Sequence, residues 1–232
     1  MQHIRPKTTE WFTYFPEDYR WSAAIGGMLG LAVVGASDMG EIDRTARKLK
    51  NKLGDDEAWF FTWQELGDEL KQKADDCRNR GHTISASVFY LRASCYYQWG
   101  ERFRTVKDDH ALNVYRKSVE CFHEHAQLSI SPKIEIVEVP YEGNFLPGYF
   151  VHAENTKKPI NPTMIFFDGL DITKELQYAR GVPELIKRGF SCLVMDGPGT
   201  GEAIRFRGMF LRPDYEVAGS ACVDYLETRE DV

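Results

Sequence analysis

The chain has 232 residues, of which 43% are hydrophobic and 28% charged, and these values are typical of globular proteins and exclude disorder and low-complexity sequence. Its formal net charge is −6, and neither the first 132 residues nor the remainder is basic, so we expect no nucleic-acid partner. Five scattered cysteines without a Cys-x-x-Cys pair predict reduced thiols and a cytoplasmic location.

The first segment gives no indication of export or membrane insertion. Residues 1–16 carry aromatic and acidic side chains rather than a basic region followed by an apolar one, so we expect no signal peptide. Residues 21–36 are nearly all apolar but contain four glycines, and they are shorter than the roughly 20 residues that a spanning helix needs. This segment predicts a buried helix or hairpin, and we expect no membrane partner.

Apolar residues recur at helical spacing through the rest of the first 130 residues. A short helix is expected over 41–53, and three longer stripes follow: Trp59, Trp63, Leu66, Leu70, Ala74 and Cys77; Ile84, Val88, Leu91 and Cys95; Ala111, Tyr115, Val119 and Phe122. The second stripe lies in a segment that is apolar nearly all round, which predicts a buried helix. We therefore predict a helical lid or cap domain of about five helices over residues 1–130.

After Ser131-Pro132 the apolar period changes to two, which is typical of strands. A hairpin is expected from Ile134 to His152, turning at 142–144. Short apolar runs at 163–167 and 192–195 predict buried strands, with a helix over 173–188 between them. Another helix, with Val223 among its inner residues, follows Pro213. Residues 131–232 therefore predict the opening strands of an α/β sheet.

Two glycine-containing motifs follow the two buried strands. Asp168-Gly169-Leu170-Asp171 lies between a strand and a helix, where unpaired backbone N–H groups and a helix N-terminus can stabilise a developing oxyanion. The alternative is a plain strand-to-helix turn with Asp171 as the N-cap. The second motif, Asp196-Gly-Pro-Gly-Thr-Gly-Glu202, lacks the Lys-Ser/Thr of a phosphate loop, so a tight structural loop is expected there.

Taken together, the motifs resemble a known superfamily. The segments MIFFDGLDITKE (164–175), CLVMDGPGTGEA (192–203) and LRPDYEVAGSACVDYLETRED (211–231) are similar to those of α/β-hydrolases. The helical segment 57–101 is similar to the N-terminal lid of one branch, which includes dihydroxy-pseudo-oxynicotine hydrolase and fungal hydrolases that shorten polyketides. The resemblance covers about residues 38–232. It implies a helical lid domain followed by the first strands of an α/β-hydrolase sheet, incomplete at the C-terminus.

The resemblance also implies a chemistry and two site residues. Gly169 and Leu170 correspond to the loop that supplies a backbone oxyanion donor, and the nucleophile is a serine in Gly-x-Ser-x-Gly. No such motif occurs in the 232 residues, and Ser220 falls inside the last predicted helix. We therefore expect the catalytic Ser, Asp and His beyond residue 232 or on another chain.

The function that follows is the N-terminal part of a serine hydrolase. Its substrate would be a small molecule, either an ester or a compound with a C–C bond next to a ketone. No cofactor and no metal are implied, and a homodimer or a second chain completing the sheet is an open expectation. The alternative is a non-catalytic helical binding or scaffold protein with a vestigial α/β segment.

The remaining candidate residues are a histidine pair and a set of aromatic side chains. His123 and His125 stand two apart near a helix end and are interpreted as solvated side chains rather than metal ligands. Trp63, Tyr90 and Tyr97 are the aromatic residues that we expect to line a substrate cleft, because pockets favour domain junctions and aromatic walls.

Overall fold

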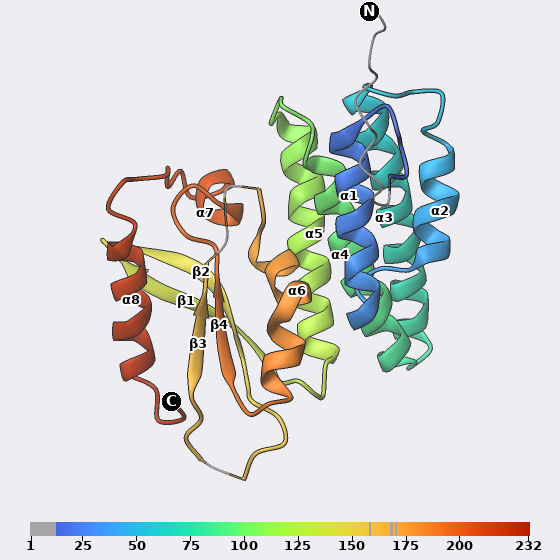
Figure 1. Cartoon of the computed structure of the whole chain (residues 1–232). Helices are drawn as coiled ribbons and strands as arrows, with labels where there is room; N and C mark the ends of the chain where they lie inside the picture. The colour runs from blue at the N-terminus through green and yellow to red at the C-terminus, as the bar shows by residue number, and fades with distance from the viewer. Residues whose placement is uncertain (1–12, 158, 168, 170) are drawn as a thin grey trace, which may run out of the picture.

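The computed structural model describes residues 13–157, 159–167, 169 and 171–232, and within them a helical part comes first and a part with both strands and helices follows (Figure 1). The helical part consists of α1 (Tyr19–Gly30), the 3-10 helix η1 (Leu31–Val34), α2 (Met39–Arg47), α3 (Asp56–Asn79), α4 (Thr83–Glu101) and α5 (Asp109–Leu128). Helix α4 packs between α3 and α5. The prediction of helices, and no strand, between residues 56 and 128 is confirmed.

Four of these helices begin in the same way, with an aspartate as the N-cap. In each case the carboxylate accepts a hydrogen bond from the backbone N–H three residues later, at 2.9–3.0 Å. The four residues are Asp18, Asp38, Asp55 and Asp108. Such a cap stabilises a helix by about 1 kcal/mol and satisfies a backbone donor that the helix leaves unpaired.

Helix α4 is buried in a different way from the prediction. Residues 93–101 are buried on every face, as expected of a helix enclosed by its neighbours. Ile84 and Val88, however, are 76% and 40% exposed, so the prediction that they are buried is wrong. They lie in the first turns of α4, where they border a surface groove beside Leu128 and Ile130 rather than packing beneath another element.

The strands begin with the predicted hairpin. Strand β1 (Ile134–Tyr141) pairs antiparallel with β2 (Asn144–Val151), in register from Ile134 opposite Val151 to Tyr141 opposite Asn144. The two residues between the strands, Glu142 and Gly143, have φ angles of 45° and 78°. Two successive positive φ angles are typical of a type I′ turn, whose twist matches that of the flanking strands.

Two further strands complete a four-stranded sheet in the order β1-β2-β4-β3. Strand β4 (Ser191–Met195) pairs antiparallel with β2 and parallel with β3 (Thr163–Phe166). Strand β3 therefore forms one edge of the sheet, and Met164 on it is 38% exposed. The crossover from β3 to β4 is α6 (Lys174–Ile186), which is the helix predicted over 173–188.

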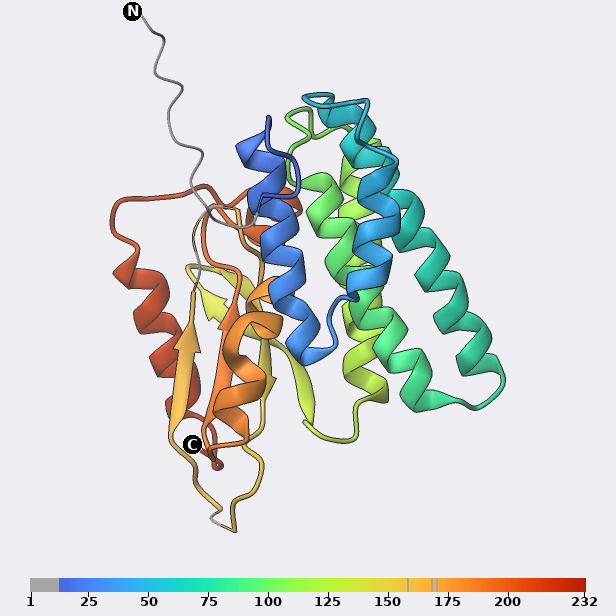
Figure 2. The same ribbon diagram turned by 45° about the vertical axis from the view of Figure 1, so that its right-hand side comes forward.

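Each face of the sheet is covered by helices, as Figures 1 and 2 show. Helix α6 lies on the face that turns toward the helical part, and α8 (Glu216–Glu227) lies on the opposite face. Helix α8 buries Ala218, Cys222 and Leu226, but Val223 is 46% exposed, so the prediction of an inward Val223 is wrong. Val223 lies on the other side of the helix, beside a groove next to β3.

The buried core is continuous across the predicted domain boundary. One cluster of buried side chains contains Trp59 and Tyr97 from the helical part together with Tyr149 and Leu176 from the α/β part. The division into domains at residue 130 therefore stays a prediction. The apolar segment 21–36 contains α1, which has 12 residues, followed by η1. No helix in the described part of the chain combines the length and apolarity needed to cross a bilayer.

Candidate functional site at the junction of helices and sheet

The loop after β3 carries the two residues expected to donate hydrogen bonds to an oxyanion. Gly169 is exposed, and its carbonyl oxygen accepts a hydrogen bond from the N–H of Ile172 at 3.2 Å. Leu170 lies outside the described residues. The role of Gly169 and Leu170 as oxyanion donors therefore stays a prediction.

The start of α6 differs from the alternative prediction for this loop. The N-cap of α6 is Thr173, so the prediction that Asp171 is the N-cap is wrong. The Asp171 carboxylate instead pairs with Arg102, the C-cap residue of α4. The first helical N–H, that of Lys174, donates to Asp196 Oδ1 at 2.9 Å, so a residue from the end of β4 satisfies this helix terminus.

The loop after β4 is closely packed around its glycines. A Cβ atom on Gly197 would lie 2.0 Å from Tyr215 Oη, and one on Gly201 would lie 2.0 Å from the Asp196 carboxyl carbon. Gly201 also has φ +44°, which L residues rarely adopt. The short helix α7 (Gly201–Arg205) follows at once. These contacts agree with the prediction of a tight structural loop.

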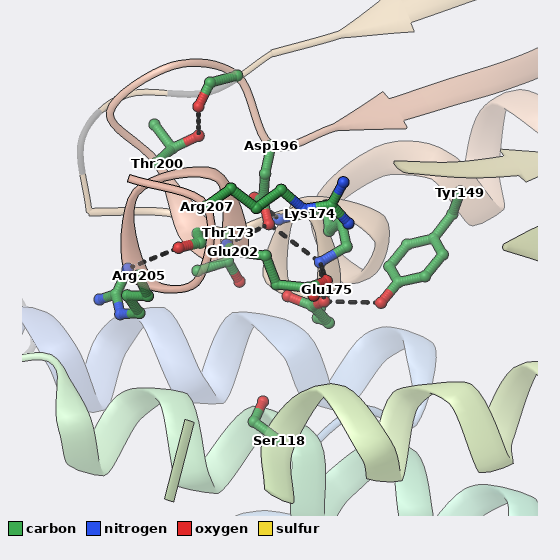
Figure 3. A network of polar contacts seen from close by, with 12 residues as sticks. Ser118, Tyr149, Thr173, Lys174, Glu175, Asp196, Thr200, Glu202, Arg205 and Arg207 are labelled. Atoms are coloured by element: carbon green, nitrogen blue, oxygen red, sulfur yellow. Dashed lines mark hydrogen bonds and ion pairs between the residues drawn. The ribbon is translucent and has the colours of Figure 1, made fainter. Parts of the chain in front are cut away.

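Asp196 joins this loop to α6. Its Oδ2 atom accepts hydrogen bonds from Lys174 Nζ at 3.0 Å and from the backbone N–H of Glu202 at 2.9 Å. Together with the hydrogen bond from the Lys174 N–H, this fully buried carboxylate accepts three hydrogen bonds from the first residues of α6 and α7 (Figure 3). Both helices follow the carboxyl ends of the parallel strands β3 and β4, where α/β sheets bind their ligands.

Lys174 is the cation of this network. Its Nζ atom lies 3.0 Å from Asp196 Oδ2, 2.7 Å from Glu175 Oε1 and 2.5 Å from Glu202 Oε2, and its side chain is 1% exposed. The three carboxylates lie within 4.8 Å of one another, a spacing that could hold a metal ion. In this structure the lysine ammonium occupies the centre of the group, so the arrangement is that of a buried ion-pair network.

The charge states follow from burial and from the neighbouring groups. Burial penalises the Lys174 ammonium, but Asp196, Glu175 and Glu202 together outweigh that penalty, so the pKa of Lys174 lies above its ordinary value. Burial has the largest single effect on the pKa of Glu175 and raises it, but the attraction of Lys174 and the hydrogen bonds from Lys174 and Tyr149 together outweigh burial and leave this pKa below its ordinary value. At Asp196 burial prevails over Lys174, and the pKa of this carboxyl is raised.

The network extends from the sheet to the helical part. Gln98 of α4 donates a hydrogen bond from Nε2 to Glu175 Oε2 at 2.8 Å, and Tyr149 of β2 donates from its hydroxyl to Glu175 Oε1 at 2.7 Å. The Thr173 hydroxyl donates to Gln98 Oε1. The buried polar side chains at the N-terminus of α6 thus fix the position of α4 against the sheet.

A cavity of about 200 Å³ lies next to this network, between the helical part and the sheet. Its walls consist of Gln98, Glu101, Arg102, Lys107 and Tyr115 from the helical side and Asp171, Thr173, Leu176 and Arg205 from the α/β side. Apart from Asp171, none of these polar residues is a candidate from the sequence, although the Thr-Lys-Glu and Gly-Glu ends of the two motifs place charged side chains a few residues after the buried strands.

The aromatic residues predicted to line a substrate cleft lie within the helical part. Trp63 is fully buried and stacks on Tyr96, with ring centroids 5.8 Å apart. The hydroxyls of Tyr90 and Tyr97 donate to Asp75 and Asp68 of α3, both at 2.6 Å. None of the three residues lines the junction cavity, and their role in substrate binding stays a prediction.

The histidine pair is not solvated, so that interpretation is wrong. His125 is 8% exposed, and its Nδ1 atom lies 2.9 Å from the Ser87 hydroxyl. His123 is half-buried, with its ring 5.8 Å from that of Tyr149. The end of α5 packs against α4 and the sheet instead of facing solvent.

The comparisons with known proteins agree with this geometry. No protein-family model matches the chain. The α/β-hydrolase xenA of Xenoacremonium sinensis is 29% identical over 93% of this chain and 51% of its own length. The 20-hydroxy-prefusarin hydrolase FUS2 of Gibberella moniliformis is 27% identical over 86% of this chain and 48% of its own length. The crystal structure of 2,6-dihydroxy-pseudo-oxynicotine hydrolase matches 87% of this chain and 54% of that one, with TM-score 0.70 and 26% identity.

These matches define the class of the fold. The described chain has a helical segment followed by the first strands of an α/β-hydrolase sheet. The resemblance to the α/β-hydrolase superfamily is confirmed, and so is the resemblance to the branch that contains the pseudo-oxynicotine hydrolase and fungal hydrolases. The chain spans about half the length of the curated relatives that it matches.

Proposed function

We propose that this chain is the N-terminal part of a serine hydrolase that cleaves an ester or a C–C bond next to a ketone. The observation that carries the proposal is the match to 2,6-dihydroxy-pseudo-oxynicotine hydrolase over 87% of this chain. The curated relatives are hydrolases as well. A substrate would bind between the helical part and the carboxyl ends of the strands, where the junction cavity lies.

In the proposed reaction a serine attacks the substrate carbonyl, activated by a histidine that an aspartate orients. Gly169 and Leu170 would contribute the backbone hydrogen bonds that stabilise the oxyanion. The three triad residues would follow Val232 in a longer polypeptide or come from a second chain. Within the described residues, Ser191 begins β4 and Ser220 lies inside α8, so neither stands at a strand-to-helix elbow.

The test compares the 232-residue chain with a longer form read from the same gene. We expect a Gly-x-Ser-x-Gly motif within about 20 residues after Val232, because the elbow follows the next strand of the sheet. The longer form should react with a fluorophosphonate probe at that serine and hydrolyse esters, and its Ser→Ala variant should lose both properties.

The 232-residue chain should show neither labelling nor turnover. Labelling of a serine within residues 1–232, or a longer form that contains the motif and stays inactive toward esters and β-diketones, would contradict the proposal. A stop codon directly after Val232 with no second chain would favour the binding or scaffold function instead.

A further inference from the structure

One of the residues that line the junction cavity, Tyr115, has a buried hydroxyl group without a hydrogen-bond partner among the described residues. The Tyr115 side chain lies on α5 and is fully buried. Its ring is covered by the Arg205 guanidinium, whose carbon lies 4.5 Å from the ring centroid. Because an unsatisfied buried hydroxyl destabilises a fold, such a group in a cavity wall indicates a ligand that accepts its hydrogen bond.

The charged side chains that line the cavity include one more cation than anions. Arg102, Lys107 and Arg205 line it together with the carboxylates of Glu101 and Asp171. The Glu101 side chain is 3% exposed and forms two ion pairs: Oε1 lies 2.5 Å from Lys107 Nζ, and Oε2 lies 2.9 Å from Arg205 Nη2. Two cations that share one buried carboxylate leave capacity for a second anionic partner.

The protonation states of Tyr115 and Lys107 follow from their burial and from the neighbouring carboxylates. Burial, followed by the nearby carboxylates of Glu175 and Asp196, raises the pKa of Tyr115 well above its ordinary value, so its hydroxyl remains a donor at neutral pH. At Lys107, burial lowers the pKa in spite of Glu101. An added anion would offset the loss of solvation at this ammonium.

We propose that the junction cavity binds a carboxylate group of the substrate, which accepts the Tyr115 hydroxyl hydrogen bond and pairs with Arg205 and Lys107. The inference rests on the proposed function only in naming the ligand a substrate. Since residues from both sides of the sheet–helix junction line the cavity, a bound carboxylate contacts the helical part through Tyr115 and Lys107 and the α/β part through Arg205 of α7. The site therefore selects acidic substrates over neutral ones of the same shape.

Calorimetric titration of the 232-residue chain with benzoate and with its neutral isostere benzamide tests the proposal directly. Benzoate should bind at least about tenfold more tightly, since hydrogen bonds to charged groups are the stronger ones. Tyr115→Phe should weaken benzoate binding about tenfold and leave benzamide unchanged. Tyr14→Phe is the control: it removes a hydroxyl that already has a partner, Asp43 at 2.6 Å, and Tyr14 does not line the junction cavity, so both ligands should bind as before.

The Tyr115→Phe variant carries its own check on folding. Removing a hydroxyl without a partner should leave the melting temperature of the ligand-free chain unchanged or raise it, so a loss of binding will not reflect unfolding. Equal binding of benzoate and benzamide, undiminished benzoate binding by Tyr115→Phe, or no saturable binding at about 10 mM benzoate would each overturn the proposal. Because no step of this titration involves a serine, its outcome is independent of the fluorophosphonate test.

Discussion

Lys174 Nζ lies 3.0 Å from Asp196 Oδ2, although the two residues are 22 positions apart in the sequence. Both side chains are buried, and the contact joins the first residue of α6 to the loop after β4. A single ion pair therefore holds together the two segments that the motif analysis treats as separate. Its removal should affect the whole junction rather than one loop.

Replacement of Lys174 by methionine should destabilise the chain by about 3–5 kcal/mol, because it leaves three carboxylates without their cation in a buried site. Lys187→Met is the matched control, since its side chain is 56% exposed and pairs only with Glu184 in the described structure. It should change the free energy of unfolding by less than about 0.5 kcal/mol. Urea unfolding measures both values, and a Lys174→Met variant as stable as the control would contradict the buried network.

Gly201→Ala should be more harmful than Gly208→Ala. Both glycines have positive φ angles, but a Cβ on Gly201 would collide with the Asp196 carboxyl group, whereas Gly208 has nothing within 4 Å. The strain of a positive φ alone costs about 1 kcal/mol, and the collision adds to it. Thermal unfolding of the two variants measures the loss of stability that the collision causes. Equal melting temperatures would show that the Asp196 carboxylate moves freely.

Stability should also depend on the protonation of His125. Burial lowers the pKa of His125 from 6.5 to about 4, despite a backbone hydrogen bond with Ser87 that raises it. As the pH falls through this interval the unfolded chain binds a proton and the folded chain does not, so the free energy of unfolding decreases. The loss by pH 4 is at most about 3 kcal/mol from this residue.

Chemical denaturation between about pH 7 and pH 5 measures this effect before ordinary carboxyl groups titrate. His125→Gln should flatten the pH dependence over that range. His82→Gln, at an exposed position, should keep the slope of the parent chain. A slope that survives in His125→Gln would assign the proton uptake to another group.

The parts of the fold that the sequence predicted are those set by local patterns. The helical spacing of Trp59 and Trp63 and the turn at Glu142-Gly143 each depend on residues a few positions apart. The fold class followed from these elements together with the resemblance to α/β-hydrolases. Element types and their order were therefore predictable.

The junction was not predictable, because its contacts join distant residues. Gln98 meets Glu175 across 77 positions, and no spacing rule relates the two. His125 stands near a helix end, which locally favours solvent, yet Ser87 and Tyr178 cover it from other helices. The lack of a hydrogen-bond partner for the Tyr115 hydroxyl could not be predicted from the sequence, where Tyr115 belongs to a stripe of apolar residues at helical spacing.

The last prediction concerns Gly169 in a longer form that carries the nucleophile. Valine at this position keeps the backbone N–H, and nothing within 4 Å obstructs its Cβ, so the fold should survive. Its branched side chain should nevertheless keep a substrate carbonyl away from the loop, and kcat should fall about 10²–10³-fold, as when an oxyanion donor is lost. Gly181→Val on α6, where a Cβ also has open space, is the control and should retain full turnover. Steady-state ester hydrolysis distinguishes the two variants, while fluorophosphonate labelling counts the intact sites. An unchanged kcat in Gly169→Val would show that this loop takes no part in the mechanism and that other groups donate the hydrogen bonds to the oxyanion.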